Sequence, residues 1–156
     1  MNFIQSVKTC FKKFAVFKGR ATRSEFWWFQ LFGLGCSFIA LTLDSALLGY
    51  DWSDTFTPLA SGFEIVMVIP LMSVTARRLH DVGMSGWFQL PVLGTYLLYL
   101  EFFVPDFTGS TAWTTILMLS GLYSLFMLVK WVKDSQPFTN QYGPSPKSDG
   151  VAEVFN

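Results

Sequence analysis

The residues of this 156-residue sequence that could carry chemistry fall into two groups, and the first surrounds the single histidine. Arginine suits bidentate contacts with carboxylates and phosphates, so this group could bind a lipid headgroup, a small anion or a protein partner. His80-Asp81 lacks the further ligands that a metal site needs and the second partner that a catalytic triad needs. We therefore predict no metal, no cofactor and no catalytic residue. This group is called the collar, and it comprises Arg20, Arg23, Glu25, Arg77, Arg78, His80 and Asp81.

The second group consists of three carboxylates inside or beside apolar stretches, Asp44, Glu64 and Glu101. A charged carboxylate in a membrane span costs a few kcal/mol, so it usually faces the protein interior or a water-filled cavity. The three could form an outward-opening acidic vestibule that binds a cation, a proton or an amine. In the other interpretation, which we favour, Asp44 and Glu101 reach the interface and Glu64 is protonated or bonded to a neighbouring hydroxyl.

Four long apolar stretches position these residues, at 26–48, 56–76, 86–104 and 112–132. Each has about the 20 residues that a helix needs to cross a bilayer. All eleven Lys and Arg lie before the first stretch, between the second and third, or at and after the end of the fourth. Short basic segments stay in the cytoplasm, so the pattern predicts a multi-pass membrane protein with both termini cytoplasmic. No basic surface suggests a nucleic-acid partner.

The two ends of the sequence differ from its middle. The spacing of Phe and Lys in residues 1–18 would place them mostly on opposite sides of a helix, which predicts an amphipathic helix lying on the membrane surface. Thr22 and Glu25 fit a capping box at the start of the first span, so Glu25 is favoured as a cap over an active carboxylate. Residues 133–156 are polar and rich in Pro and Gly, which predicts an irregular cytoplasmic tail.

The predicted fold is therefore all-α: an interfacial helix, a four-helix transmembrane bundle at 19–132 and an irregular tail. The segment before the first span and the connection between the second and third spans both lie on the predicted cytoplasmic side, and we expect them to meet there. We expect the collar to form one network there, with Asp81 accepting from at least one arginine.

Three segments on the predicted cytoplasmic side carry a family resemblance. Residues 17–28 resemble the N-terminal signature of the DUF805 family, and residues 77–87 resemble its central motif. Residues 140–146 are similar to its C-terminal ending, with Ser145 where the family usually has Asp. Asp44 is similar in position to an acidic residue that the family often has late in its first span. The resemblance implies a small bacterial inner-membrane protein with four helices, and it carries over no catalytic residue or ligand.

These observations favour a non-enzymatic inner-membrane protein whose collar binds lipid headgroups, a protein partner or a small anionic ligand. The alternative is an oligomeric channel or carrier that uses the acidic vestibule. An enzyme acting on lipid through His80 and Asp81 ranks third. The partners expected are membrane lipids and either a second copy of the chain or another membrane protein.

Overall fold

The computed structural model describes residues 1–51, 57–99 and 111–147. Apart from one isolated bridge between Asn140 and Gly143, the regular structure in these ranges is helical. The all-α prediction is thus confirmed for the described residues. The elements are α1 (Phe3–Lys12), α2 (Arg23–Leu48), α3 (Pro58–Asp81), the 3-10 helix η1 (Gly86–Gln89), α4 (Leu90–Tyr99) and α5 (Thr111–Val132).

Three of the described helices, α2, α3 and α5, are long and apolar enough to cross a membrane. The predicted third span differs in its first turn, because residues 86–89 form a 3-10 helix before α4 begins. Pro91 lacks an N–H and is tolerated only near a helix start, which explains why the α-helix begins beside it. The end of that predicted span lies outside the described residues. A count of four spans therefore stays a prediction.

Two helix ends differ from the predicted boundaries in ways that matter for the collar. α3 continues to Asp81, five residues beyond the predicted end, so Arg77, Arg78, His80 and Asp81 lie on its last turns. α1 ends at Lys12, earlier than predicted, because the chain must turn back toward α2. That turn includes Gly19, whose φ of 88° is open to glycine and costly for other residues.

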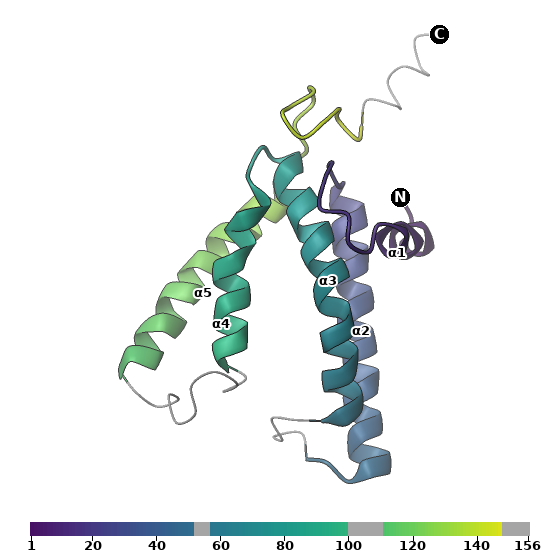
Figure 1. Cartoon of the computed structure of the whole chain (residues 1–156), viewed down its shortest axis with the longest axis vertical. Helices are drawn as coiled ribbons and strands as arrows, with labels where there is room; N and C mark the ends of the chain where they lie inside the picture. The colour runs from purple at the N-terminus through teal and green to yellow at the C-terminus, as the bar shows by residue number, and fades with distance from the viewer. Residues whose placement is uncertain (52–56, 100–110, 148–156) are drawn as a thin grey trace.

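The helices form two pairs rather than one closely packed bundle (Figure 1). α2 packs along α3, and α4 packs along α5. The two pairs converge at the end where the N-terminus and the tail lie, and they diverge toward the other end. The converging end, called here the collar end, also carries α1, which lies against α2 with its axis steeply inclined to the long helices (Figure 1).

The core lies under α1, where Cys10, Ala21, Phe26, Phe29 and Val74 are buried together. Phe11 packs edge-on against Phe29 and Phe32, with ring centroids 5.5 and 5.7 Å apart. Elsewhere most of the large apolar side chains of the long helices face outward; Leu34 and Met118, for example, are 70% and 73% exposed. Helices that are apolar all round suit a lipid environment.

Candidate functional site

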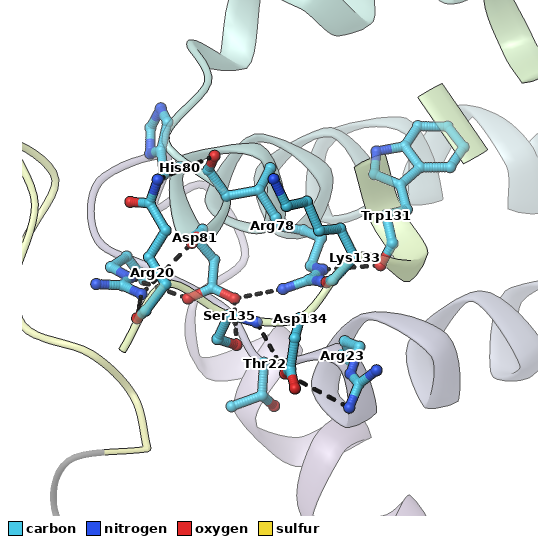
Figure 2. Close-up of polar contacts among 12 residues, drawn as sticks. Arg20, Thr22, Arg23, Arg78, His80, Asp81, Trp131, Lys133, Asp134 and Ser135 are labelled. Atoms are coloured by element: carbon cyan, nitrogen blue, oxygen red, sulfur yellow. Dashed lines mark hydrogen bonds and ion pairs between the residues drawn. The ribbon is translucent and has the colours of Figure 1, made fainter. Parts of the chain in front are cut away.

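Asp81 is the centre of a buried ionic cluster at the collar end (Figure 2). Its carboxylate accepts from Arg20 Nε at 2.9 Å, from Arg78 Nη1 and from the Ser135 hydroxyl. The predicted contact between Asp81 and an arginine is therefore present, and it is made twice. We call Arg20, Arg78, Asp81 and Ser135 the clamp.

Arg20 connects the clamp to the tail. Its guanidinium donates to the carbonyl oxygens of Gln136, Phe138 and Gly143, the last two at 2.8 and 3.3 Å. Arg20 follows the turn at Gly19, and this places the side chain between α3 and the tail. A single buried guanidinium thus ties the segment before α2 to residues more than 110 positions away.

Arg78 connects the clamp to α5. It donates from Nε to the Trp131 carbonyl at 3.0 Å and from Nη2 to the Lys133 carbonyl. The last carbonyls of a helix have no partner within the helix, and a cation at this end also complements the helix dipole. Arg78 therefore holds the end of α5 against the end of α3.

Arg77 and Glu25 form a second buried ion pair, with side chains 1% and 5% exposed. Thr22 Oγ1 accepts from the Glu25 amide as predicted, but the second half of the capping box is wrong. The Glu25 carboxylate contacts Arg77 instead of reaching back, since an unpaired buried guanidinium would be costly. Within the described residues, Nε and Nη2 of Arg77 have no hydrogen-bond partner.

Cys10 lies beside this pair, with its thiol 3.8 Å from a Glu25 oxygen. Burial raises the pKa of Cys10 to about 12, and the neighbouring Glu25 charge raises it as well, against an opposing effect of Arg77. A thiol with such a pKa stays protonated at neutral pH and is a poor nucleophile. Cys10 therefore acts as a small buried residue that packs α1 against α2.

His80 occupies the other side of the α3 end. Its Nδ1 lies 3.1 Å from the Gly19 carbonyl, and its ring stacks on Tyr142 with centroids 3.9 Å apart. Asn140 donates to the His80 carbonyl at 2.9 Å. Across the described ranges, no group of three or more His, Cys, Asp or Glu is placed to hold a metal ion.

Arg23 is the collar member that stays accessible. It lies 3.5 Å from Asp134, which also accepts from Lys147, and all three side chains are roughly half exposed. The hydrogen bond from Lys147 is the main reason that the pKa of Asp134 is lowered, followed by the Ser135 amide. A cavity of about 620 Å³ adjoins Arg23 and Lys147, with Lys13 and Thr9 also in its wall. We call Lys13, Arg23 and Lys147 the cationic pocket.

The acidic candidates are not gathered in one described cavity. Asp44 is fully buried and accepts from the backbone amides of Leu59 and Ala60, at 3.0 and 2.8 Å. It therefore caps α3 from the neighbouring helix, which Thr57 does not do with its own side chain. Glu64 lines a different cavity, of about 340 Å³, whose wall does not include Asp44. Glu101 lies outside the described residues.

Sequence reasoning missed the residues that the tail contributes to the site. Ser135 bonds Asp81, Asn140 bonds the His80 carbonyl, and Tyr142 stacks on the His80 ring. One signal could have pointed to them. Residues 140–146 resemble a family motif, and a motif in an otherwise irregular tail suggests that the tail is docked.

An all-helical chain with spanning helices, an amphipathic first helix and a buried ionic clamp at one end defines an integral membrane protein. The family profile described as "Protein of unknown function (DUF805)" matches residues 14–144, and the chain belongs to this family. It is similar to "Inner membrane protein YhaH" of Escherichia coli K12, with 28% identity over 136 residues, 87% of this chain and 91% of the relative. It is also similar to "Inner membrane protein YhaI" of the same organism, with 30% identity over 104 residues, 64% and 83% of the two chains. No solved structure matches it significantly.

Proposed function

We propose that this protein is a non-enzymatic inner-membrane protein that binds the headgroups of anionic lipids at its collar end. The proposal rests on one observation: some cations at the collar end are buried, and others are exposed. Arg20, Arg77 and Arg78 are buried and bonded to carboxylates within the protein. Arg23 and Lys147 stay about half exposed at the same end, so they are available to an external anion.

The placement of α1 supports this proposal. The helix lies beside α2 at a steep angle to the long helices, as a helix lying on a membrane surface would (Figure 1). Its Ile4 and Phe11 are exposed apolar residues, and Lys8 and Lys12 are exposed cations. An amphipathic helix of this kind inserts its apolar side chains beneath the headgroups and attracts anionic lipids with its basic ones. Each basic residue near the surface contributes about 1 kcal/mol.

The charge of the cationic pocket also fits a phosphate. Lys13, Arg23 and Lys147 line the cavity, and the last two share a single exposed carboxylate, Asp134, which is not part of its wall. Glu25 also borders the cavity, but its charge is compensated by Arg77. The pocket therefore holds an excess of positive charge where the first helix meets the tail.

The orientation in the membrane is part of the proposal. The positive-inside distribution favours a cytoplasmic collar end, with both termini and the clamp on that side. The apolar stretch at 86–104 would then provide a fourth span. The lipids bound would be those of the inner leaflet, whose surface potential is negative.

Spin-labelled lipids in proteoliposomes test this function. We expect the protein to restrict labelled phosphatidylglycerol in preference to labelled phosphatidylcholine, and the preference to weaken between 0.05 and 0.5 M NaCl as charges are screened, on the scale expected from the Debye length (about 10 Å at 0.1 M). The triple variant K13Q/R23Q/K147Q should lose roughly half of the preference.

The matched control K13R/R23K/K147R keeps every charge and should keep the preference. Equal restriction of both lipids by the wild-type protein would contradict the proposal, as would an unchanged preference in the triple Gln variant.

A further inference from the structure

A third cavity, of about 490 Å³, lies beside His80 at the end of α3. It shares no wall residue with the cationic pocket. Most of its wall is apolar and comes from the segment after α1, from α3, from η1 with its cap Ser85, and from the start of α4. Its lining includes Phe17, Met72, Ala76, Trp87 and Leu90, with the polar residues Lys18, His80, Ser85 and Gln89.

Close packing between η1 and α3 shapes this cavity. A Cβ built on Gly86 would lie 2.8 Å from the Ala76 Cβ, so only glycine allows η1 to approach α3 this closely. Ser85 caps η1 by accepting from the Trp87 amide. One side of the cavity is therefore fixed by the close packing of the η1 backbone against α3.

The Gln89 amide is the first sign that the cavity has an occupant. Gln89 is 9% exposed and lines the cavity, and its side chain forms no hydrogen bond to any residue in the described ranges. The amide is not among the fully buried groups that lack a partner, so it stays reachable, and as part of the cavity wall it can donate to and accept from a molecule bound there.

His80 provides the second sign. The Gly19 carbonyl can only accept, so the proton of the His80 ring lies on Nδ1. Nε2 of the neutral ring is then an acceptor. It lies on the Gly86 side, 3.4 Å from where a Cβ on Gly86 would be, and no residue of the described chain donates to it. The cavity wall thus offers a free ring acceptor to a bound donor.

The surroundings of the cavity identify the class of occupant. Trp87 and Phe88 are 76% and 47% exposed, and indole side chains at a helix end favour the membrane interface. Lys18 adds a cation that complements a phosphate. An apolar wall, a cation, an amide and one ring acceptor together match a molecule with an acyl chain, a phosphate and a hydroxyl group.

We propose that this cavity binds one phospholipid whose headgroup combines a phosphodiester with a free hydroxyl, as in phosphatidylglycerol. Lys18 and the Gln89 amide donate to the phosphate oxygens, and the headgroup hydroxyl donates to His80 Nε2. The start of an acyl chain lies along Phe17, Met72 and Leu90. This site is distinct from the cationic pocket, and it recognises a hydroxyl group and not charge alone.

Native mass spectrometry of the full chain, released from nanodiscs, tests this site with two lipids. Phosphatidylglycerol and phosphatidylmethanol carry the same charge, but only the first has headgroup hydroxyls. We expect the wild-type protein to retain one phosphatidylglycerol in preference to phosphatidylmethanol by about threefold to tenfold, the value of one neutral hydrogen bond.

Two variants locate the effect. His80→Phe keeps a ring that can stack on Tyr142 but has no Nε2, and it should lose the discrimination between the two lipids. Gln89→Glu places a carboxylate near the phosphate without a change of size, and it should reduce retention of both lipids. Gln89→Glu still tests the site if His80→Phe does not fold. Lys133→Gln removes an exposed cation outside the cavity and should retain lipid as the wild type does.

Three results would overturn the inference. The first is equal retention of the two lipids by the wild-type protein, and the second is normal retention by Gln89→Glu. The third is displacement of the retained lipid by millimolar glycerol 1-phosphate, which would show that the site takes a soluble headgroup. K13Q/R23Q/K147Q should still retain this lipid, so failure here and failure of the proposed charge-dependent binding are separable.

Discussion

Asp81 and Asp134 are each held by two cations at the collar end, yet they belong to different environments. Asp81 is fully buried between Arg20 and Arg78, whereas Asp134 is 61% exposed beside Arg23 and Lys147. A buried pair must remain complete, because removal of one partner leaves an unsolvated charge. An exposed pair exchanges freely with water and salt and contributes little to stability. The first cluster therefore holds the fold together, and the second is free to meet a ligand.

The difference arises from where the chain places each aspartate. Asp81 ends α3, under the end of α5 and the tail, so both partners reach it inside the protein. Asp134 follows the end of α5 and faces outward. The partners differ as well: the buried cluster uses two arginines, which can satisfy several acceptors at once, and the exposed one includes a lysine.

The largest expected effect is that of Asp81→Asn. The change keeps the size of the side chain but leaves Arg20 and Arg78 buried without a carboxylate, and we expect a loss of about 3–5 kcal/mol in the free energy of unfolding. Unfolding in mixed micelles titrated with SDS measures it. Asp134→Asn is the matched control and should unfold as the wild type does. Equal stability of the two variants would remove the distinction between the clusters.

Glu25→Gln should have the next largest effect, about 3 kcal/mol, because it leaves only one guanidinium, Arg77, without its counter-ion. The double variant Glu25→Leu/Arg77→Met removes both charges and should be more stable than Glu25→Gln in the same assay. If the double variant were the less stable, the pair would have a role beyond mutual compensation of charge.

Asp44 offers a third environment, a buried carboxylate bonded to backbone amides and not to a cation in the described chain. Asp44→Ala should cost about 1 kcal/mol, and at most about 2, as expected for the loss of a helix cap. Asp44→Asn retains one acceptor oxygen and should cost less. A large defect in cation flux through proteoliposomes, with stability unchanged, would favour the acidic vestibule over the cap.

The raised pKa of Cys10 predicts a smaller, pH-dependent change in the stability of the docked α1. Its pKa in the folded protein, about 12, lies above the ordinary value of 9.0, so folding favours the protonated thiol. The resulting stabilisation is complete below pH 9 and is lost as the pH rises toward 12. In a Cys36→Ser background, maleimide labelling of Cys10 near pH 8 should be roughly a hundredfold slower than labelling of a cysteine at exposed position 8. Comparable rates would show that α1 is not docked.

Much of the architecture was predictable from charge and hydropathy. The three long helices, the amphipathic first helix and the contact between Asp81 and arginine follow from apolar runs, from the Phe and Lys spacing and from opposite charges near one membrane boundary. The extent of α3 was not predictable in this way, because Arg77 and Arg78 read as the polar end of a span. They lie on the helix because the protein, and not water, satisfies their charges.

Local sequence patterns could not predict the role of Glu25 or the contacts made by the tail. A capping box is a relation between neighbours, and it cannot show that Arg77, 52 residues away, competes for the same carboxylate. Arg20 bonds to tail carbonyls in a similar way, and backbone acceptors leave no mark in the sequence. Neither the favoured interpretation of Asp44, at the interface, nor the alternative, in a vestibule, included a helix cap, because a sequence shows an acid near the end of a span but not the amides of α3 that it bonds.

A pair of double-mutant cycles tests most directly the claim that burial separates a structural cluster from an accessible one. The first cycle combines Arg20→Met with Asp81→Asn, and the second combines Arg23→Met with Asp134→Asn, all measured by SDS unfolding in the same micelles. We predict a coupling free energy of about 2–3 kcal/mol for Arg20 and Asp81, and none that exceeds the experimental error for Arg23 and Asp134. Equal coupling in the two cycles, or a larger one for Arg23 and Asp134, would contradict the account.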